Sequence, residues 1–221
     1  DGGSVAADRY VADFAATEKP LSEGGRWVCG TAAGLGWNNP LSLSGRACAS
    51  VRSGAGGSRY DDSIAHLSSS LVAVREDQYA QGTVYRASGY SPASSKHEIE
   101  LLLRFEITAH GARGYEILWG HDGDFAIVRW NGPLGDYTDL GVNGPGPGVA
   151  VDGDVLRAEM TGNLIMVYKN GLLVGTSPPN STWKVGQPGL GFWPDDSSPP
   201  AKFGWTRFEE GRGSPVSIVS V

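Results

Sequence analysis

The stretch VLRAEMTGNLIMVYKNGLLVGT, residues 155–176, decides the fold of this chain. Apolar and polar residues alternate over 156–160, which is typical of a strand with one buried face. Two turn sequences follow, Thr161–Gly162–Asn163 and Lys169–Asn170–Gly171, and Asn-Gly adopts the positive φ angles that a tight hairpin needs. Three glycines and two turns within 22 residues argue against a helix. The stretch therefore predicts a β-meander of three short strands.

A family resemblance rests on the same residues. The turn "G-N-x-I", the strand "x-V-Y-x-N-G" and the later sequence Gly186–Gln187–Pro188–Gly189–Leu190–Gly191–Phe192 resemble concanavalin A-like lectin/glucanase domains. Laminin-G-like modules and laminarinase-type glycosidases share that fold. The resemblance covers roughly the C-terminal two-thirds of the chain and implies an all-β, two-sheet antiparallel β-sandwich (jelly roll). It does not select an activity, because the fold hosts lectins, hydrolases, lyases and adhesion modules.

Composition agrees with a single domain spanning residues 1–221. The chain has 33 glycines and 13 prolines, and 40% of its residues are hydrophobic, which indicates many turns around a real core. A net charge of −6 without a Lys/Arg cluster argues against a nucleic-acid partner. No apolar run reaches membrane-spanning length, so we expect no membrane insertion.

Cys29 and Cys48 are the only two cysteines. An even count in a Gly/Ser-rich chain predicts one disulfide and a secreted or extracytoplasmic protein. The bridge would close a loop of about 20 residues and contribute about 3 kcal/mol in the chain-entropy model. Two buried free thiols are the alternative.

The strand from His97 to Phe105 carries the candidate acidic residues of an enzyme. Strict alternation predicts that one face holds Ile99, Leu101, Leu103 and Phe105, and that the other holds Glu98, Glu100, Leu102 and Arg104. Laminarinase-type glycosidases carry Glu-x-Asp-x-x-Glu on one strand. The resemblance makes Glu98 the nucleophile and Glu100 its helper, but Leu103 stands where the acid/base should be. The alternative is a solvated polar face with pairs across strands.

A lyase of the same fold would use a Tyr and a His for proton transfer and an Arg to neutralise a uronate carboxylate. The residue types are present as His97, His121, Tyr115, Arg104 and Arg129. The strand motifs of alginate lyases are absent. If the chain is an enzyme, the candidate catalytic residues are therefore Glu98, Glu100, His97, His121 and Tyr115.

Seven tryptophans favour sugar binding, because an indole ring stacks on the apolar face of a sugar. Trp27 and Trp205 lie in strand patterns and are expected in the core. Trp130 and Trp193 are the strongest binding candidates. The remaining predicted ligand-binding residues are Trp37, Trp119, Arg104 and Arg129.

Calcium is common in this fold, held by carboxylates and backbone carbonyls. Asp122 and Asp124 flank a predicted hairpin turn and are the candidate ligands for a structural ion. Other spaced pairs are Asp136 with Asp139, Asp152 with Asp154, and Asp195 with Asp196. Asp is also a favoured turn residue, so each pair has a structural explanation as well.

Together these observations predict a secreted glycan-binding module that recognises a poly- or oligosaccharide in a concave groove. The groove would be lined by the loop tryptophans and by Glu98, Glu100, Arg104 and Arg129. The alternatives are a polysaccharide-cleaving enzyme, lyase before hydrolase, and a structural or adhesion domain without catalysis.

Overall fold

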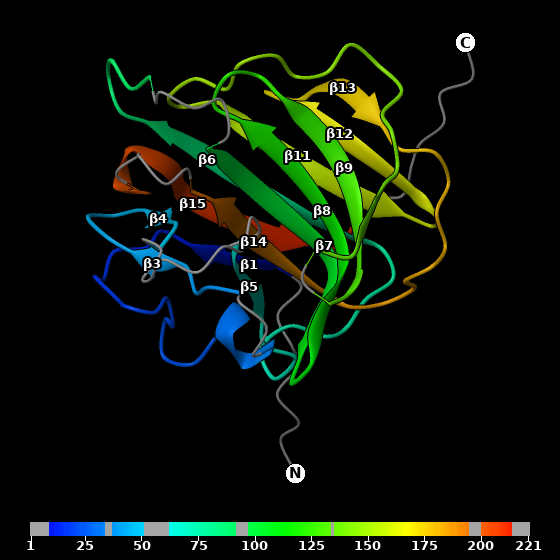
Figure 1. Ribbon diagram of the computed structural model, residues 1–221, viewed down its shortest axis with the longest axis horizontal. Helices are drawn as coiled ribbons and strands as arrows, with labels where there is room; N and C mark the ends of the chain where they lie inside the picture. Colours follow the sequence, from blue (N-terminus) through cyan, green and yellow to red (C-terminus); the bar gives the residue numbers. More distant parts are fainter. Residues whose placement is uncertain are drawn as a thin grey trace.

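The chain folds as two antiparallel β-sheets packed face to face, as the computed structural model shows (Figure 1). The structure describes residues 9–33, 37–50, 62–91, 97–133, 135–194 and 200–213. Two short 3₁₀ turns, η1 (Gly30–Ala33) and η2 (Pro200–Lys202), are the helical elements of this part. No helix within these ranges is long and apolar enough to span a membrane. The predicted all-β, two-sheet sandwich is confirmed.

One sheet contains the predicted meander. Its described strands are, in spatial order, β13 (Leu172–Thr176), β12 (Leu164–Lys169), β11 (Val155–Thr161), β6 (Gln78–Arg86), β15 (Phe203–Gly211), β4 (Ala47–Cys48) and β3 (Leu41–Ser42), and β1 (Arg9–Ala12) also pairs with β15. We call this the eight-stranded sheet. Both meander turns use positive φ angles, at Gly162, Asn170 and Gly171. The strand limits confirm the prediction for residues 155–176.

The other sheet carries the strand with the candidate carboxylates. Its described strands are, in spatial order, β10 (Tyr137–Asp139), β9 (Phe125–Gly132), β8 (Gly111–Gly120), β7 (Glu98–Thr108), β14 (Gln187–Trp193), β5 (Ser63–Leu67) and β2 (Trp27–Cys29). We call this the seven-stranded sheet. β7 lies near its centre, between β8 and β14.

The main core lies between the sheets. Alternate residues of β11, β12 and β6 meet alternate residues of β7, β8 and β9 there. Trp119 and Trp205 are almost fully buried and lie edge to face, with ring centroids 6.5 Å apart. Trp27 and Trp205 are both buried, as predicted. A second apolar cluster lies on the outer face of the seven-stranded sheet and includes Trp37, Ile64, Leu102, Phe105 and Trp130.

The predicted alternation of β7 is wrong beyond Leu103. Arg104 has a φ of 46°, and the pairing with β8 shifts between Leu103 and Glu106. This β-bulge inserts an extra residue and exchanges the two faces. Phe105 consequently packs in the outer cluster instead of the main core.

Arg104 therefore does not share a face with Glu98 and Glu100. Its guanidinium donates to three backbone carbonyl oxygens, those of Glu76 at 2.7 Å, Trp183 at 3.0 Å and Gly162 at 2.5 Å. Its side chain is 3% exposed. Arg104 thus ties the bulge to the eight-stranded sheet and is a structural residue.

The predicted disulfide is also wrong. Cys29 and Cys48 are free thiols, and they lie in different sheets, in β2 and β4. The Cys29 Sγ donates a hydrogen bond to the Leu21 carbonyl oxygen at 3.2 Å. Burial raises the pKa of each thiol to about 11, so both stay protonated at neutral pH. The alternative of two free thiols is the one the structure contains.

Candidate functional site: an acidic groove on the outer face of the seven-stranded sheet

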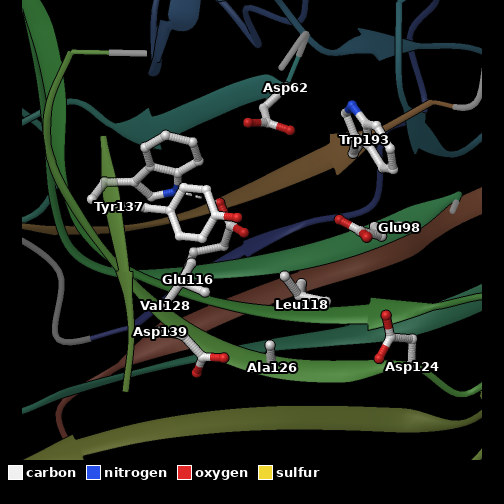
Figure 2. Close-up of a pocket in the computed structure, with 11 residues that line it drawn as sticks. Asp62, Glu98, Glu116, Leu118, Asp124, Ala126, Val128, Tyr137, Asp139 and Trp193 are labelled. Atoms are coloured by element: carbon white, nitrogen blue, oxygen red, sulfur yellow. Dashed lines mark hydrogen bonds between the residues drawn. The ribbon is translucent and has the colours of Figure 1, made fainter. Parts of the chain in front are cut away.

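A groove with a volume of about 580 Å³ crosses the outer face of the seven-stranded sheet (Figure 2). Five carboxylates, three aromatic rings and three apolar side chains line it: Asp62, Glu98, Glu116, Asp124, Asp139, Trp130, Tyr137, Trp193, Leu118, Ala126 and Val128. They come from β7, β8, β9, β10 and β14, and from the residues just before β5 and β9. We call this site the acidic groove.

Strand pairing arranges the groove in rows. Trp193 of β14 pairs with Glu98 of β7, and Figure 2 shows the two side chains together at one side of the groove. Glu116 of β8 pairs with Val128 of β9, which pairs in turn with Asp139 of β10. Side chains that share a row project from the same face of a sheet. The register thus gathers residues from distant parts of the sequence.

Small residues hollow out the surface between these rows. Gly191 pairs with Glu100, and a Cβ at Gly191 would lie only 2.0 Å from Glu100 Oε2. A Cβ at Gly120 would lie 2.6 Å from Asp122 Oδ1. Any larger residue at Gly191 would displace the Glu100 carboxyl group. The second glycine of the "G-L-G-F" sequence, Gly191, therefore makes room for a carboxyl group beneath the groove.

Glu100 lies under the floor of the groove. It projects from the same face of β7 as Glu98, its register partner Leu118 lines the groove, and it is fully buried. Neither carboxyl oxygen has a hydrogen-bond partner among the described residues. Burial raises the pKa of Glu100 well above its usual range, and the negative charges of Glu116, Asp62 and Glu98 raise it further. Both causes disfavour the ionised form of Glu100.

Glu116 is the second buried carboxyl group of the groove. It is 3% exposed and accepts a 2.6 Å hydrogen bond from Trp130 Nε1. Burial raises its pKa to about 7, although the indole N–H opposes this shift by stabilising the carboxylate. Near neutral pH, Glu116 can hold or release a proton inside the groove.

The aromatic rings differ in exposure. Trp130 is 3% exposed and packs edge-on against Trp37, with ring centroids 4.6 Å apart. Tyr137 is 44% exposed and lies tilted against Trp130 at 5.4 Å. Trp193 is half-buried. Tyr137 and Trp193 therefore offer ring surface to a ligand, whereas Trp37 supports Trp130 from behind.

The structure brings together only part of the predicted binding set. Trp130, Trp193, Glu98 and Asp124 line the acidic groove. Trp119 lies in the main core. Arg129 lies outside the lining and donates to Asn131 Oδ1 and to the hydroxyls of Thr138 and Thr182. Trp37 contributes to the outer cluster without lining the groove.

The Tyr and His residues predicted for a lyase lie elsewhere. The Tyr115 side chain is fully buried, and its hydroxyl donates to Asn180 Oδ1 at 2.9 Å. His97 and His121 are buried beside Tyr90, whose hydroxyl shares a hydrogen bond with Nδ1 of His97. None of these three predicted catalytic residues lines the groove.

The predicted calcium ligands serve the β8–β9 hairpin. Asp122 Oδ1 accepts from the Asp124 backbone N–H at 3.1 Å, and Asp124 Oδ1 accepts from the Phe125 N–H at 3.0 Å. Across the described ranges, no three His, Cys, Asp or Glu side chains are grouped as a metal ion requires. Asp195 and Asp196 lie outside the described residues. Calcium at Asp122 and Asp124 stays a prediction.

Four lining residues were missed as binding or catalytic candidates: Asp62, Glu116, Tyr137 and Asp139. Glu116 had a usable signal, because its position two residues before Leu118 places the two side chains on one face of a strand. Tyr137 and Asp139 belong to a three-residue strand within a Gly/Pro-rich segment, where alternation is too short to detect. Asp62 precedes β5 and had no such signal.

No family model matches the chain, and no curated protein matches it. Solved structures do. A native glycosidic hydrolase matches with a TM-score of 0.59 at 14% identity, over 96% of this chain and 100% of that one. The CBM2 module of the evolved Dit protein of Lactobacillus casei BL23 phage J-1 matches with a TM-score of 0.52 at 10% identity, over 95% and 97%. The potassium-bound Emp46p carbohydrate recognition domain matches with a TM-score of 0.51 at 11% identity, over 86% and 90%. At these identities the likeness shows the fold, a concanavalin A-like β-sandwich.

Proposed function

We propose that this protein binds a poly- or oligosaccharide in the acidic groove. The observation that carries the proposal is that rings with accessible surface and carboxylate acceptors face one groove of about 580 Å³. Tyr137 and Trp193 can stack on the apolar faces of sugar rings. Carboxylates such as Glu98 and Asp139 can accept hydrogen bonds from sugar hydroxyls. Pockets of this size are typical of small-ligand sites.

The fold neighbours support the same class of ligand. By their names, two of the three neighbours are a glycosidic hydrolase and a carbohydrate recognition domain. A secreted or extracytoplasmic location would bring such a protein to polysaccharides. We propose this location because of the ligand class, since the structure lacks the disulfide from which it was first predicted.

A panel of soluble neutral polysaccharides and oligosaccharides, titrated calorimetrically, tests the proposal. We expect binding to at least one of them. Trp193→Ala should then weaken the affinity about fivefold or more, which corresponds to about 1 kcal/mol. A chain that binds no saccharide, or whose affinity is unchanged in Trp193→Ala, would contradict the proposal.

Glycoside hydrolysis is a second candidate, favoured by one observation. Glu116 on β8 pairs with Leu102 of β7 and adds a carboxyl group to the face that also carries Glu98 and Glu100, although the acid/base position of the family motif is occupied by Leu103. In a retaining mechanism, Glu116 would protonate the leaving oxygen and Glu98 would form the glycosyl-enzyme bond. The positions of Tyr115, His97 and His121 give no support to a lyase.

Release of reducing ends from a β-glucan distinguishes the two functions. A hydrolase should release them and lose several orders of magnitude of turnover in Glu116→Gln and in Glu98→Gln, because each removes a group that acts in the covalent step. A binding module should release none. In a binding module, Glu98→Gln and Glu100→Gln should change the affinity only modestly, because an amide still accepts hydrogen bonds.

A further inference from the structure

The charged side chains that line the acidic groove, among the described residues, are all acidic. The lining contains five carboxylates, and no Lys, Arg or His is among the lining residues that the structure describes. Asp124 and Asp139 are exposed, and each accepts a hydrogen bond from a backbone N–H instead of from a cation. A negatively charged groove of this kind repels uronates and sulfated sugars and attracts cations.

A second, independent observation points to a cationic ligand. Glu100 is fully buried beneath the floor, and its two carboxyl oxygens have no hydrogen-bond partner among the described residues. Buried carboxyl groups are normally paired or hydrogen-bonded. The three negative charges that act on Glu100 all belong to groove-lining residues, Glu116, Asp62 and Glu98. A positive group in the groove would relieve this repulsion.

The aromatic side chains of the lining indicate which kind of cation the groove would bind. Ammonium groups bind over the faces of Trp and Tyr through the quadrupole of the ring, and Tyr137 and Trp193 present ring surface beside carboxylates. A bare metal ion prefers several converging oxygen ligands. No such group of three ligands exists in the described part of the chain. An organic ammonium therefore fits this lining better than a metal ion does.

We infer that the acidic groove binds an amino sugar chain with free amino groups, of the glucosamine type, in preference to neutral or acidic saccharides. The inference rests on the proposed saccharide-binding function and adds the charge of the ligand to it. The sugar rings would stack on Tyr137 and Trp193. The ammonium groups would lie against Glu116, Asp124 and Asp139.

Three oligosaccharides of matched length test the inference on the full chain. They are a glucosamine oligosaccharide, the same oligosaccharide fully N-acetylated, and a uronic acid oligosaccharide. We expect the glucosamine chain to bind about tenfold tighter than its N-acetylated form at low salt, from cation–π and charge contributions. The uronic acid chain should bind weakest. The preference should shrink at 0.5 M salt, because exposed charges are screened.

Matched variants separate the groove from the overall charge of −6. Asp139→Asn and Asp124→Asn each remove one negative charge from the groove and should reduce the amine preference about threefold. Asp13→Asn removes one charge from an exposed residue next to β1 of the other sheet and should leave the preference unchanged.

Each outcome is decisive. If the N-acetylated chain binds as tightly as the glucosamine chain, the charge preference is wrong while saccharide binding stands. If Asp13→Asn lowers the preference as much as Asp139→Asn does, the attraction is non-specific and the inference fails. If no saccharide of any charge binds, the proposed function fails with it.

Discussion

The carboxylates on the outer faces of the two sheets have different partners. On the eight-stranded sheet, Glu209 lies 2.6 Å from the guanidinium of Arg9, and Glu159 lies 3.1 Å from that of Arg157. Arg157 also lies over the ring of Tyr79 at 3.5 Å. On the seven-stranded sheet, Asp124 and Asp139 of the acidic groove instead accept hydrogen bonds from backbone N–H groups.

The difference supports the groove face as the candidate binding face. A carboxylate matched by an Arg has its charge compensated within the protein. The acidic groove instead contains two buried carboxyl groups, Glu100 and Glu116, whose ionisation is unfavourable. Perturbed acidic groups in a groove are characteristic of functional sites.

The largest expected effect concerns aromatic packing. Trp130 is 3% exposed and supports one end of the groove, whereas Tyr168 on the eight-stranded sheet is half-buried. Trp130→Ala should lower the free energy of unfolding by about 3–5 kcal/mol, and Tyr168→Ala by less than about 1 kcal/mol. Urea denaturation measures both. The sequence alone had made Trp130 one of the two strongest binding candidates, and its burial gives it a structural role as well. Equal losses in the two variants would show that Trp130 is not structural.

The next effect is the pH dependence of stability. Because the pKa of Glu116 rises from 4.5 when unfolded to about 7 when folded, its contribution to stability is complete below pH 4.5. That contribution is lost as the pH rises toward and through 7, and Glu100 acts in the same direction. From pH 5 to pH 8 the free energy of unfolding should fall by roughly 3 kcal/mol.

Glu116→Gln should remove much of that decline, because an amide does not ionise. Glu159→Gln on the other sheet should keep the decline and lower stability slightly at every pH, because Arg157 loses its partner. Melting temperatures measured every half pH unit decide this. A decline that persists unchanged in Glu116→Gln would show that the groove carboxyl groups do not cause it.

Sequence predicted the meander because its evidence is local. Alternation in 156–160 and the turns at Gly162 and Asn170–Gly171 specify strand limits within one window. The alternation of β7 was right as far as Leu103 and failed at Arg104. A bulge depends on the pairing of β7 with its neighbours and on the three carbonyl groups that hold the guanidinium. Neither is encoded at that point of the sequence.

The sequence predicted site residues only where they lie within one recognisable strand. Glu98 and Glu100 both belong to β7, although the structure buries Glu100 beneath the groove that it was expected to line. Trp193 ends a recognisable strand. Glu116 becomes a groove residue because β8 pairs with β7 in one particular register. Tyr137 and Asp139 enter through β10, which lies inside a Gly/Pro-rich segment, residues 131–149, that has no strand-like alternation. Composition suggested sugar binding, but the location of the groove needed the sheet order.

The central claim, that a saccharide binds in the acidic groove, is tested most directly by two tyrosines on opposite faces. Tyr137 lies at the groove, and Tyr168 lies on the outer face of the eight-stranded sheet. The affinity of each Tyr→Ala variant would be measured by calorimetry with the saccharide that binds most tightly in the panel. Tyr137→Ala should weaken binding about fivefold, equivalent to about 1 kcal/mol, and Tyr168→Ala should leave it unchanged. Loss of affinity in Tyr168→Ala with none in Tyr137→Ala would place the ligand on the other sheet and contradict this account.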